Sequence, residues 1–296
     1  MELTRKQFDV LSALAMTNEK LSQRDMEEIT GHSLGTINKA IKDLAGVGYV
    51  SDGEITSQGV DALEPYRAKK AIFIAAGFGS RMVPVTLSIP KPLVRVKGQR
   101  IIDGLIDACL AAGIEEIYIV RGYLAENFDA LLSKYPMIRF LENGEYNDAN
   151  NISSAIRAKD LMQNAYVLEA DLLISNPKII RKYHYRSDFL AIKKDRSDDW
   201  CFKTKDGYIS ELRHGGTDCW QEVGISYWNA EDGRKLSEHI PEAYKMPGGR
   251  ELFFEAVPLK VFIPEYKVEI CPCKDEDIIE IDSFNELKKI DKTYDV

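Results

Sequence analysis

The amino-acid sequence predicts an α/β fold with a mixed, mainly parallel sheet, preceded by a small helical domain. From residue 69 onward, short apolar runs alternate with amphipathic helical segments, the pattern of a parallel sheet covered by helices on both faces. A later Lys205-Asp206-Gly207 turn between two short strand-like runs predicts an antiparallel hairpin, so the sheet is expected to be mixed. Residues 1–68 follow another pattern, and the chain is therefore divided into domains 1–68 and 69–296.

The composition is that of an ordinary globular protein and narrows the class of function. The 296 residues are 45% hydrophobic and 29% charged, with a formal net charge of -8. Such a charge does not draw the whole molecule to nucleic acid or to anionic lipid. No apolar run approaches the ~20 residues of a membrane span, and the N-terminus lacks a signal-peptide pattern. We therefore expect a cytoplasmic location with no membrane association.

The first domain is expected to consist of three helices and a hairpin. Apolar residues recur at helical spacing in Leu3–Met16, and Ser22 with Asp25 forms a capping box ahead of a second helix. Leu34–Leu44 reads as a third helix, and Asp52-Gly53 as a hairpin turn. This order, with a tight turn between the second and third helices, resembles a winged helix-turn-helix module.

Such a module suggests DNA binding, but its charge argues against it. The third helix would offer Thr36, Asn38, Lys39 and Lys42 to a DNA groove. Residues 1–68, however, contain 7 Lys and Arg against 11 Asp and Glu, a net of -4. DNA-binding modules usually carry an excess of positive charge for phosphate contacts. DNA binding through residues 1–68 and a role in dimerisation or effector sensing both remain open.

In the second domain, strands and helices are expected to alternate. Four strands are predicted at Ala71–Ala76, Glu116–Val120, Ile138–Leu141 and Ala165–Glu169. Three helices are predicted between them, at Arg100–Ala112, Glu126–Lys134 and Asn150–Leu161. The hairpin is expected to follow, with strands at Trp200–Thr204 and Tyr208–Leu212.

A glycine-rich loop after the first strand is the most informative segment. It reads Ala75-Ala76-Gly77-Phe78-Gly79-Ser80-Arg81, and Pro90-Lys91-Pro92 follows. Glycines here let backbone N–H groups approach a phosphate chain. A dinucleotide fingerprint would need a third glycine near Met82, and a P-loop would need Gly-Lys-Ser/Thr. Both are absent, and two cations near the loop suit a triphosphate whose α-phosphorus gains charge in the transition state.

This segment, with Pro84-x-Thr86 between its two halves, resembles the signature of the nucleotidyltransferases that activate sugar phosphates and choline phosphate. The resemblance implies a Rossmann-like nucleotidyltransferase domain in which Arg81 and Lys91 are catalytic and Lys91 contacts the α-phosphate. It also implies a nucleotide-binding set, which we assign to Ala75, Ala76, Gly77, Phe78, Gly79, Ser80, Arg81, Lys91, Gly122, Tyr123, Asn151 and Ser153.

The resemblance further implies two aspartates that hold Mg²⁺, for which this sequence offers Asp171 and Asp282. Mg²⁺ prefers hard oxygen ligands and bridges phosphates. The alternative is that Asp171 merely ends a strand and that Asp282 or Ser283 caps a helix, with Glu286 closing the box.

From about Lys70 to Ile290 the chain resembles the bacterial CTP:phosphocholine cytidylyltransferases. The resemblance is carried by Asn150-Asn151-x-Ser153, Asp199-Trp200, Glu222-x-Gly224-x-Ser226-Tyr227-Trp228 and Glu280-Ile281-Asp282-Ser283. It implies that CTP and phosphocholine are converted to CDP-choline and pyrophosphate. A trimethylammonium group is held by aromatic faces and a nearby carboxylate, and the residues expected to hold it are Trp200, Trp228, Tyr227, Phe254 and Glu255.

Other functions stay open at this point. The chain has Phe253-Phe254-Glu255 where the choline enzymes tend to have Tyr-Trp-Asp, so a primary amine such as aminoethylphosphonate or phosphoethanolamine is an alternative acceptor. A sugar-1-phosphate nucleotidyltransferase is a second alternative. A transcriptional regulator that only senses a nucleotide is a third, although that function predicts a damaged catalytic set and this one is complete.

Overall fold

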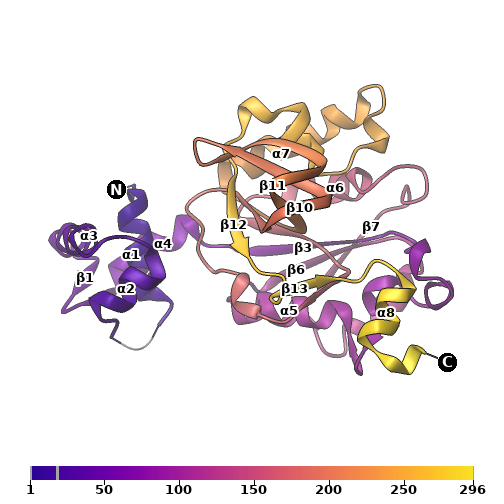
Figure 1. Cartoon of the computed structure of the whole chain (residues 1–296), viewed down its shortest axis with the longest axis horizontal. Helices are drawn as coiled ribbons and strands as arrows, with labels where there is room; N and C mark the ends of the chain where they lie inside the picture. The colour runs from indigo at the N-terminus through magenta and orange to yellow at the C-terminus, as the bar shows by residue number, and fades with distance from the viewer. Residues whose placement is uncertain (1, 18–19, 296) are drawn as a thin grey trace. The chain divides into compact units, whose positions relative to one another are not determined.

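The computed structural model describes residues 2–17 and 20–295. It divides into two compact units, Met1–Arg67 and Ala68–Val296, where the sequence pattern placed the division after residue 68. Each unit has its own buried side chains. Figure 1 labels the helices and strands of both. Within the described residues, no helix combines the length and the apolar character that a membrane span requires.

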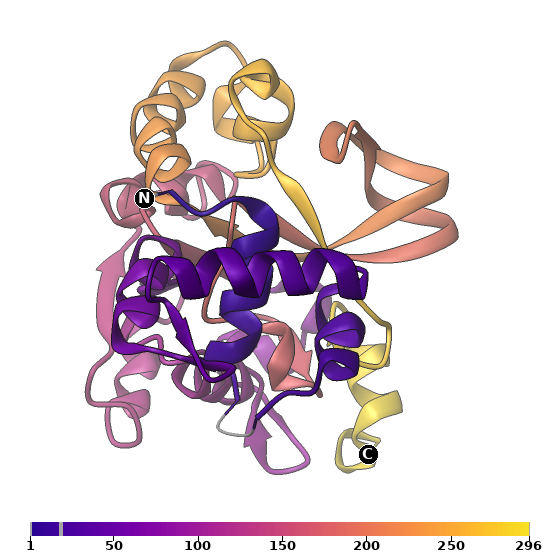
Figure 2. The same ribbon diagram turned by 90° about the vertical axis from the view of Figure 1, so that its left-hand side faces the viewer.

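The N-terminal unit has the predicted order of elements, which Figure 2 shows in indigo and purple. Its elements are α1 (Arg5–Ala15), α2 (Gln23–Thr30), α3 (Leu34–Gly46), β1 (Val50–Ser51), β2 (Glu54–Ile55) and α4 (Ser57–Leu63). β1 and β2 pair in an antiparallel hairpin. Asp52 and Gly53 at its turn have φ of 53° and 83°, the left-handed values that a two-residue hairpin turn needs.

The predicted capping box of α2 is present, since the Ser22 side chain accepts a hydrogen bond from the backbone N–H of Asp25. Ser33 occupies the N-cap position of α3 but makes no capping hydrogen bond. Glu27 of α2 takes this role instead, because its carboxylate accepts from the backbone N–H of Leu34 at 2.8 Å.

The C-terminal unit is built on one large sheet. Its strands are β3 (Lys70–Ala75), β4 (Arg95–Val96), β5 (Gln99–Arg100), β6 (Glu116–Arg121), β7 (Arg139–Glu142), β8 (Ala165–Glu169), β9 (Leu172–Ile174), β10 (Asp188–Lys205), β11 (Tyr208–Trp228), β12 (Glu269–Cys273) and β13 (Ile278–Glu280). Its α-helices are α5 (Ile101–Ala111), α6 (Ile152–Ala158), α7 (Ala230–Lys245) and α8 (Phe284–Ile290).

Seven strands form the main sheet, in the order β12-β10-β11-β8-β3-β6-β7. The strands β8, β3, β6 and β7 are mutually parallel, β11 is antiparallel to β8, and β10 is antiparallel to β11. β12 then runs parallel to β10. The predicted mixed, mainly parallel sheet is therefore confirmed. The glycine-rich loop that follows β3, called the phosphate loop below, leaves the sheet at its carboxyl edge, where ligands of open α/β sheets bind.

Helices cover both faces of this sheet, with α5 on one side and α6 and α7 on the other (Figure 1). The α5 side is packed by apolar residues such as Phe73, Ile102 and Leu105. The opposite side packs Ile72 against Ile152 and Leu236 from the other two helices. Ile72 and Phe73 are consecutive and point to opposite faces, which is why β3 is apolar at nearly every position.

Two predicted elements differ from the structure. The predicted helix Glu126–Lys134 is instead a 3₁₀ segment, Ala125–Leu131, preceded by Leu124 at a φ of 46° with no capping side chain. The predicted hairpin at residues 200–212 is only the tip of a much longer one. β10 and β11 have 18 and 21 residues, and their bulges let Cys201 pair both with Arg213 and with Gln221. The hairpin therefore curls back on itself, which turn chemistry alone does not predict.

Gly233 of α7 allows a test of this packing. A Cβ built at Gly233 would lie 2.4 Å from the carbonyl oxygen of Met162 and 2.6 Å from the Cα of Gln163. Gly233→Ala should therefore lower the free energy of unfolding of the C-terminal unit by about 1–3 kcal/mol through overpacking. Urea unfolding followed by tryptophan fluorescence measures this. Gly144→Ala in the same unit, which meets nothing within 4 Å, is the control and should be neutral or stabilising. Equal stability of both variants would contradict the packing argument.

Candidate active site

The phosphate loop begins where β3 ends and is shaped by two glycines. Gly77 has open space where a Cβ would lie, so its backbone is accessible. Gly79 has a φ of 66°, and a Cβ there would approach the Lys91 side chain at 3.1 Å. The Thr86 hydroxyl donates to the carbonyl oxygen of Gly79 at 3.0 Å. These contacts fold the loop back on the segment that carries Lys91 and place Arg81 on the short helix Ser80–Met82.

Asp171 and Asp282 are brought together by two short strands. β9 follows Asp171 directly, and β13 ends two residues before Asp282. These strands pair antiparallel with Glu280 opposite Leu172, and the backbone N–H of Ile281 donates to the carbonyl oxygen of Asp171 at 3.2 Å. Two carboxylates that are far apart in the sequence therefore lie at one site.

Lys91 lies between these carboxylates. Its ammonium is 2.7 Å from Asp171 and 3.2 Å from Asp282, and Lys91 is only 8% exposed. Arg81 pairs with the other oxygen of Asp282 at 2.5 Å. Burial opposes a charge on Lys91, but the two aspartates outweigh it and raise the pKa of Lys91. Burial likewise opposes ionisation of Asp282, but hydrogen bonding to Glu280 and the charges of Lys91 and Arg81 lower its pKa.

Two adjoining cavities open on this cluster. The first, of about 300 Å³, is lined by the glycine loop and by Ile74, Ala75, Gly77, Gly79, Ser80, Arg81, Lys91, Pro92, Asn151, Glu169, Ala170, Asp171, Phe253 and Asp282. The second, of about 350 Å³, is lined by Arg81, Glu169, Asp171, Asp199, Trp200, Leu212, His214, Glu222, Phe253, Glu255, Ala256, Lys260, Glu280 and Asp282. We call them the loop cavity and the acidic cavity.

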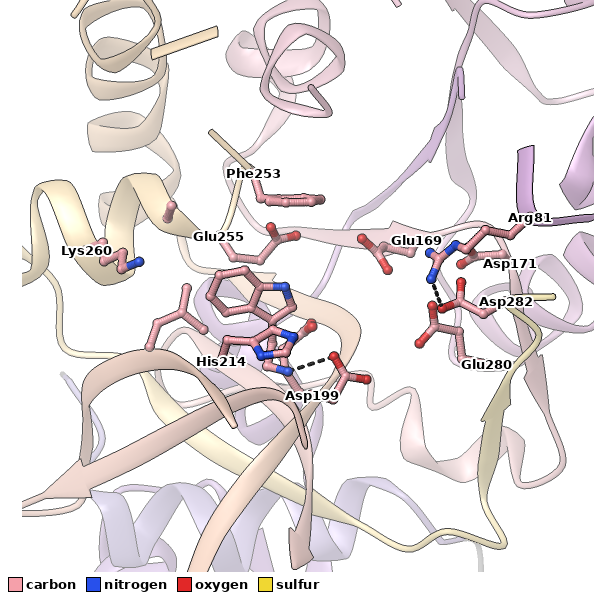
Figure 3. A pocket seen from close by; sticks show the side chains of 14 residues that line it. Arg81, Glu169, Asp171, Asp199, His214, Phe253, Glu255, Lys260, Glu280 and Asp282 are labelled. Carbon is pink, nitrogen blue, oxygen red and sulfur yellow. Dashed lines mark hydrogen bonds and ion pairs between the residues drawn. The ribbon is translucent and has the colours of Figure 1, made fainter. Parts of the chain in front are cut away.

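The acidic cavity has a cation at each end and carboxylates between them. In Figure 3, Lys260 lies at one end and Arg81 at the other, with Glu255, Glu169 and Asp199 in the space between. The carboxylates of Glu169, Asp171 and Glu280 each offer an oxygen within 4.8 Å of the others. Such a set of oxygen donors fits a divalent cation.

Comparison with known proteins agrees with this geometry. A family model described as nucleotidyl transferase matches residues 70–198. A 2-aminoethylphosphonate cytidylyltransferase from Lancefieldella rimae is 39% identical over 228 residues, covering 76% of this chain and 92% of that protein. A choline-phosphate cytidylyltransferase from Streptococcus pneumoniae is 32% identical over 230 residues, covering 75% of this chain and 97% of that protein.

The chain belongs to the nucleotidyl transferase family, among its cytidylyltransferases. A solved structure of the CTP:phosphocholine cytidylyltransferase from Streptococcus pneumoniae has the same fold, with a TM-score of 0.70, 30% identity, and coverage of 77% of this chain and 99% of that one. A MarR family model matches residues 2–54. The expected winged helix domain is thereby confirmed, whereas DNA binding by it stays a prediction.

The loop cavity of this cytidylyltransferase contains most of the predicted nucleotide set. Ala75, Gly77, Gly79, Ser80, Arg81, Lys91 and Asn151 line it. Ala76, Phe78, Gly122, Tyr123 and Ser153 line neither cavity. Phe78 and Tyr123 instead support the loop, because their rings meet edge to face at 4.6 Å and the backbone N–H of Tyr123 donates to the carbonyl oxygen of Ala76 at 3.0 Å. A Cβ on Gly122 would collide with Tyr146 at 2.7 Å.

Ser153 was predicted to bind the nucleotide, and the structure corrects this. The residue is 1% exposed, and its hydroxyl accepts from the Asn143 side chain at 3.0 Å and donates to the carbonyl oxygen of Asn150 at 2.8 Å. Its hydrogen-bonding groups are therefore used inside the protein. Ser153 fixes the start of α6 and does not reach the cavity.

Three predicted acceptor residues are also corrected. Tyr227 and Trp228 are 0% exposed and Phe254 is 1% exposed, and none of them lines either cavity. Alternation along β11 sends Tyr227 into the core under α5 and Trp228 into the core under α7, where Trp228 meets Phe254 edge to face at 5.9 Å. Of the predicted acceptor residues, only Trp200 and Glu255 line the acidic cavity.

Several residues that line this cavity were not predicted as site residues from the sequence. Glu169 and Glu280 each lie two residues before a predicted metal ligand, a spacing that puts both side chains of a strand end on one face. Glu222 was noticed only as part of a motif. Gly224, at a φ of 72°, explains that motif, because a Cβ there would lie 2.8 Å from the Glu169 carboxylate. Phe253 is 43% exposed and its ring lines the cavity, whereas the sequence pointed to its neighbour Phe254.

Burial and mutual repulsion give these carboxylates unusual acidities. Burial, and then the charges of Asp171, Glu222 and Glu255, raise the pKa of Glu169 well above its usual value. Burial followed by Glu255 does the same for Glu222. Burial raises the pKa of Glu255 to about 7, and burial with Asp171 and Asp282 raises that of Glu280 to about 8. The cavity therefore favours either a proton or a bound cation.

The free energy of unfolding should consequently depend on pH. The unfolded Glu255 titrates near 4.5 and the folded one near 7, so between these values the native state holds more protons. The stabilising contribution of Glu255 is therefore complete below the pKa of the unfolded chain, near 4.5, and is lost as the pH rises through the pKa of the folded protein, near 7. Urea unfolding at pH 5, 6, 7 and 8 should show stability falling as the pH rises.

Glu255→Gln should reduce this fall and stabilise the ligand-free protein at pH 8 by about 1–3 kcal/mol. The matched control is Glu251→Gln, a substitution of an exposed acid in the same segment, which should leave the pH dependence unchanged. Identical pH dependence in the wild type and in Glu255→Gln would show that Glu255 does not titrate as described.

Proposed function

We propose that this cytidylyltransferase transfers the cytidylyl group of CTP to 2-aminoethylphosphonate. A phosphonate oxygen of the acceptor attacks the α-phosphorus of CTP, and the bond from that phosphorus to the oxygen bridging it to the β-phosphate breaks. The products are CMP-2-aminoethylphosphonate and pyrophosphate. The attacking oxygen is already anionic, so the reaction needs in-line placement and charge neutralisation more than a general base.

The observation that carries this proposal is the carboxylate lining of the acidic cavity. A primary ammonium has three N–H donors and is held best by hydrogen bonds to carboxylates. Glu169, Glu222 and Glu255 offer such acceptors in a partly buried setting where their own charges repel one another. An ammonium group would relieve that repulsion, which is the physical reason for preferring an amine as the acceptor's second group.

The aromatic lining supports a primary amine over a trimethylammonium. A quaternary ammonium is held by several ring faces around it. Among the described residues, the aromatic side chains that line this cavity are Trp200, Phe253 and His214. The Lys260 ammonium lies 5.6 Å from the Trp200 ring and occupies part of that face. One relative is named for 2-aminoethylphosphonate and the other for choline phosphate, and the first has the higher identity to this chain.

Phosphocholine is the second candidate, favoured by the exposed Phe253 ring next to Trp200, 6.1 Å between centroids. The two acceptors make opposite demands on the cavity. Removing a carboxylate hydrogen-bond acceptor should harm a primary amine much more than a trimethylammonium, which donates no hydrogen bond from nitrogen.

We further propose that Mg²⁺ serves this reaction. The Asp171 Oδ1 atom is buried without a hydrogen-bond partner, and the Asp171 carboxylate offers an oxygen within 4.8 Å of one from Glu169 and one from Glu280, so this donor set fits the ion. Asp171 would hold it with these two glutamates, and when bound it would neutralise phosphate charge. Asp282, whose oxygens pair with Lys91 and Arg81, stays the second predicted ligand. Arg81 and Lys91 supply the cations of the chain itself, and the loop after β3 supplies backbone N–H groups.

The acceptor is tested by pyrophosphate release from CTP and Mg²⁺ with 2-aminoethylphosphonate, phosphoethanolamine, phosphocholine and glucose-1-phosphate. We expect the highest kcat/KM with 2-aminoethylphosphonate. Glu255→Gln should raise KM for this acceptor about 10–100-fold, since a hydrogen bond to a charged group is lost, with little change in KM for CTP. Glu251→Gln is the matched control. A higher kcat/KM with phosphocholine, insensitive to Glu255→Gln, would refute the proposal.

Lys91 tests the charge-neutralisation mechanism. Lys91→Met keeps the length of the side chain and removes its charge, so kcat should fall about 10²–10³-fold, or about 2.7–4 kcal/mol of transition-state stabilisation. Lys274→Met, at a side chain 75% exposed, is the control and should keep full activity. Circular dichroism establishes that both variants are folded. Unchanged kcat in Lys91→Met would remove Lys91 from the catalytic set.

A further inference from the structure

Asn151 lies at the boundary between the two cavities. It is the residue before α6 and lines the loop cavity. Its Oδ1 accepts a hydrogen bond from the backbone N–H of Phe254 at 2.6 Å. Burial raises the pKa of Glu255, while hydrogen bonds from its own backbone and from the Asn151 side chain lower it. The Asn151 carboxamide therefore contacts the segment that forms one wall of the acidic cavity.

Asn150 holds the other end of that wall. Its backbone N–H donates to the carbonyl oxygen of Arg250 at 2.7 Å, and its side-chain amide donates to that of Glu251 at 3.2 Å. The two asparagines thus bind the segment 250–255 at both ends. This segment carries Phe253 and Glu255, and Phe253 lines both cavities.

The helix that follows these two asparagines is itself packed in the core. Ile152 and Ala155 of α6 are 0% exposed and pack in the same core cluster as Ile72 of β3. β3 also carries the glycine loop at its end. Glu255 is thereby fixed, through Asn151 and α6, relative to the strand that positions the nucleotide phosphates.

We propose that Asn151 is a positioning residue for the acceptor. Its Oδ1 accepts from the backbone N–H of Phe254, the residue before Glu255, and it thereby fixes the orientation of the segment that carries Glu255. This inference rests on the proposed function, because Glu255 is taken to hold the ammonium of the acceptor. It assigns to Asn151 a role other than the nucleotide contact expected from the sequence.

Two variants separate this role from the alternatives. Asn151→Leu removes both polar groups at similar volume, and it should raise KM for 2-aminoethylphosphonate about tenfold or more while KM for CTP changes less than about twofold. Asn151→Asp keeps an oxygen for the N–H of Phe254. Its KM for 2-aminoethylphosphonate should therefore stay within about threefold of the wild-type value.

A double-mutant cycle with Glu255→Gln completes the experiment. If Asn151 acts through Glu255, adding Asn151→Leu to Glu255→Gln should raise KM for the acceptor little further, whereas independent residues would have multiplicative effects. Multiplicative effects, a dominant rise in KM for CTP, or a KM for the acceptor in Asn151→Asp as high as in Asn151→Leu would each overturn the proposal. Absence of turnover of 2-aminoethylphosphonate by the wild type would instead refute the proposed function, and is seen before any variant is compared.

Discussion

The buried ammonium of Lys91 between Asp171 and Asp282 is the interaction on which the site depends. Two carboxylates held this close in a partly buried place repel each other unless a cation lies between them. Lys91 supplies that cation, and Arg81 adds a second one on the outer side of Asp282. The glycine loop is shaped around Lys91 as well, since a side chain on Gly79 would collide with it. Loop, carboxylates and cations therefore form one unit.

This unit matches the charges that the proposed reaction needs. A nucleoside triphosphate requires cations and backbone N–H groups, which Arg81, Lys91 and the loop provide, and a divalent ion requires carboxylates, which Asp171 and Asp282 provide. In the ligand-free protein these groups neutralise one another. Substrate binding then exchanges internal ion pairs for pairs with the ligands, so the buried charges need no large rearrangement to become useful.

The acceptor side has instead an excess of negative charge in a partly buried place. No ion pair among the described residues involves Glu169, Glu222 or Glu255, and burial raises the pKa of each, with repulsion from neighbouring carboxylates adding to it for Glu169 and Glu222. The segment that carries Glu255 is tied to α6 by Asn150 and Asn151. On the proposed function, the acceptor is therefore selected by a segment that is distant in sequence from the glycine-rich loop but linked to it through the sheet.

The sequence by itself determined the domain order, the mixed sheet and the glycine-rich loop, because these depend on local patterns and on spacing within short motifs. Its assignment of Asp171 and Asp282 to a metal ion stays a prediction. It did not determine which rings face the acceptor. Tyr227, Trp228 and Phe254 belong to motifs that resemble those of choline enzymes, yet packing buries them in the core. Only the tertiary structure decided this, because the curl of β10 and β11 and the pairing of β9 with β13 are long-range contacts. Those contacts select Glu169, Glu222, Phe253 and Glu280 for the cavity in their place.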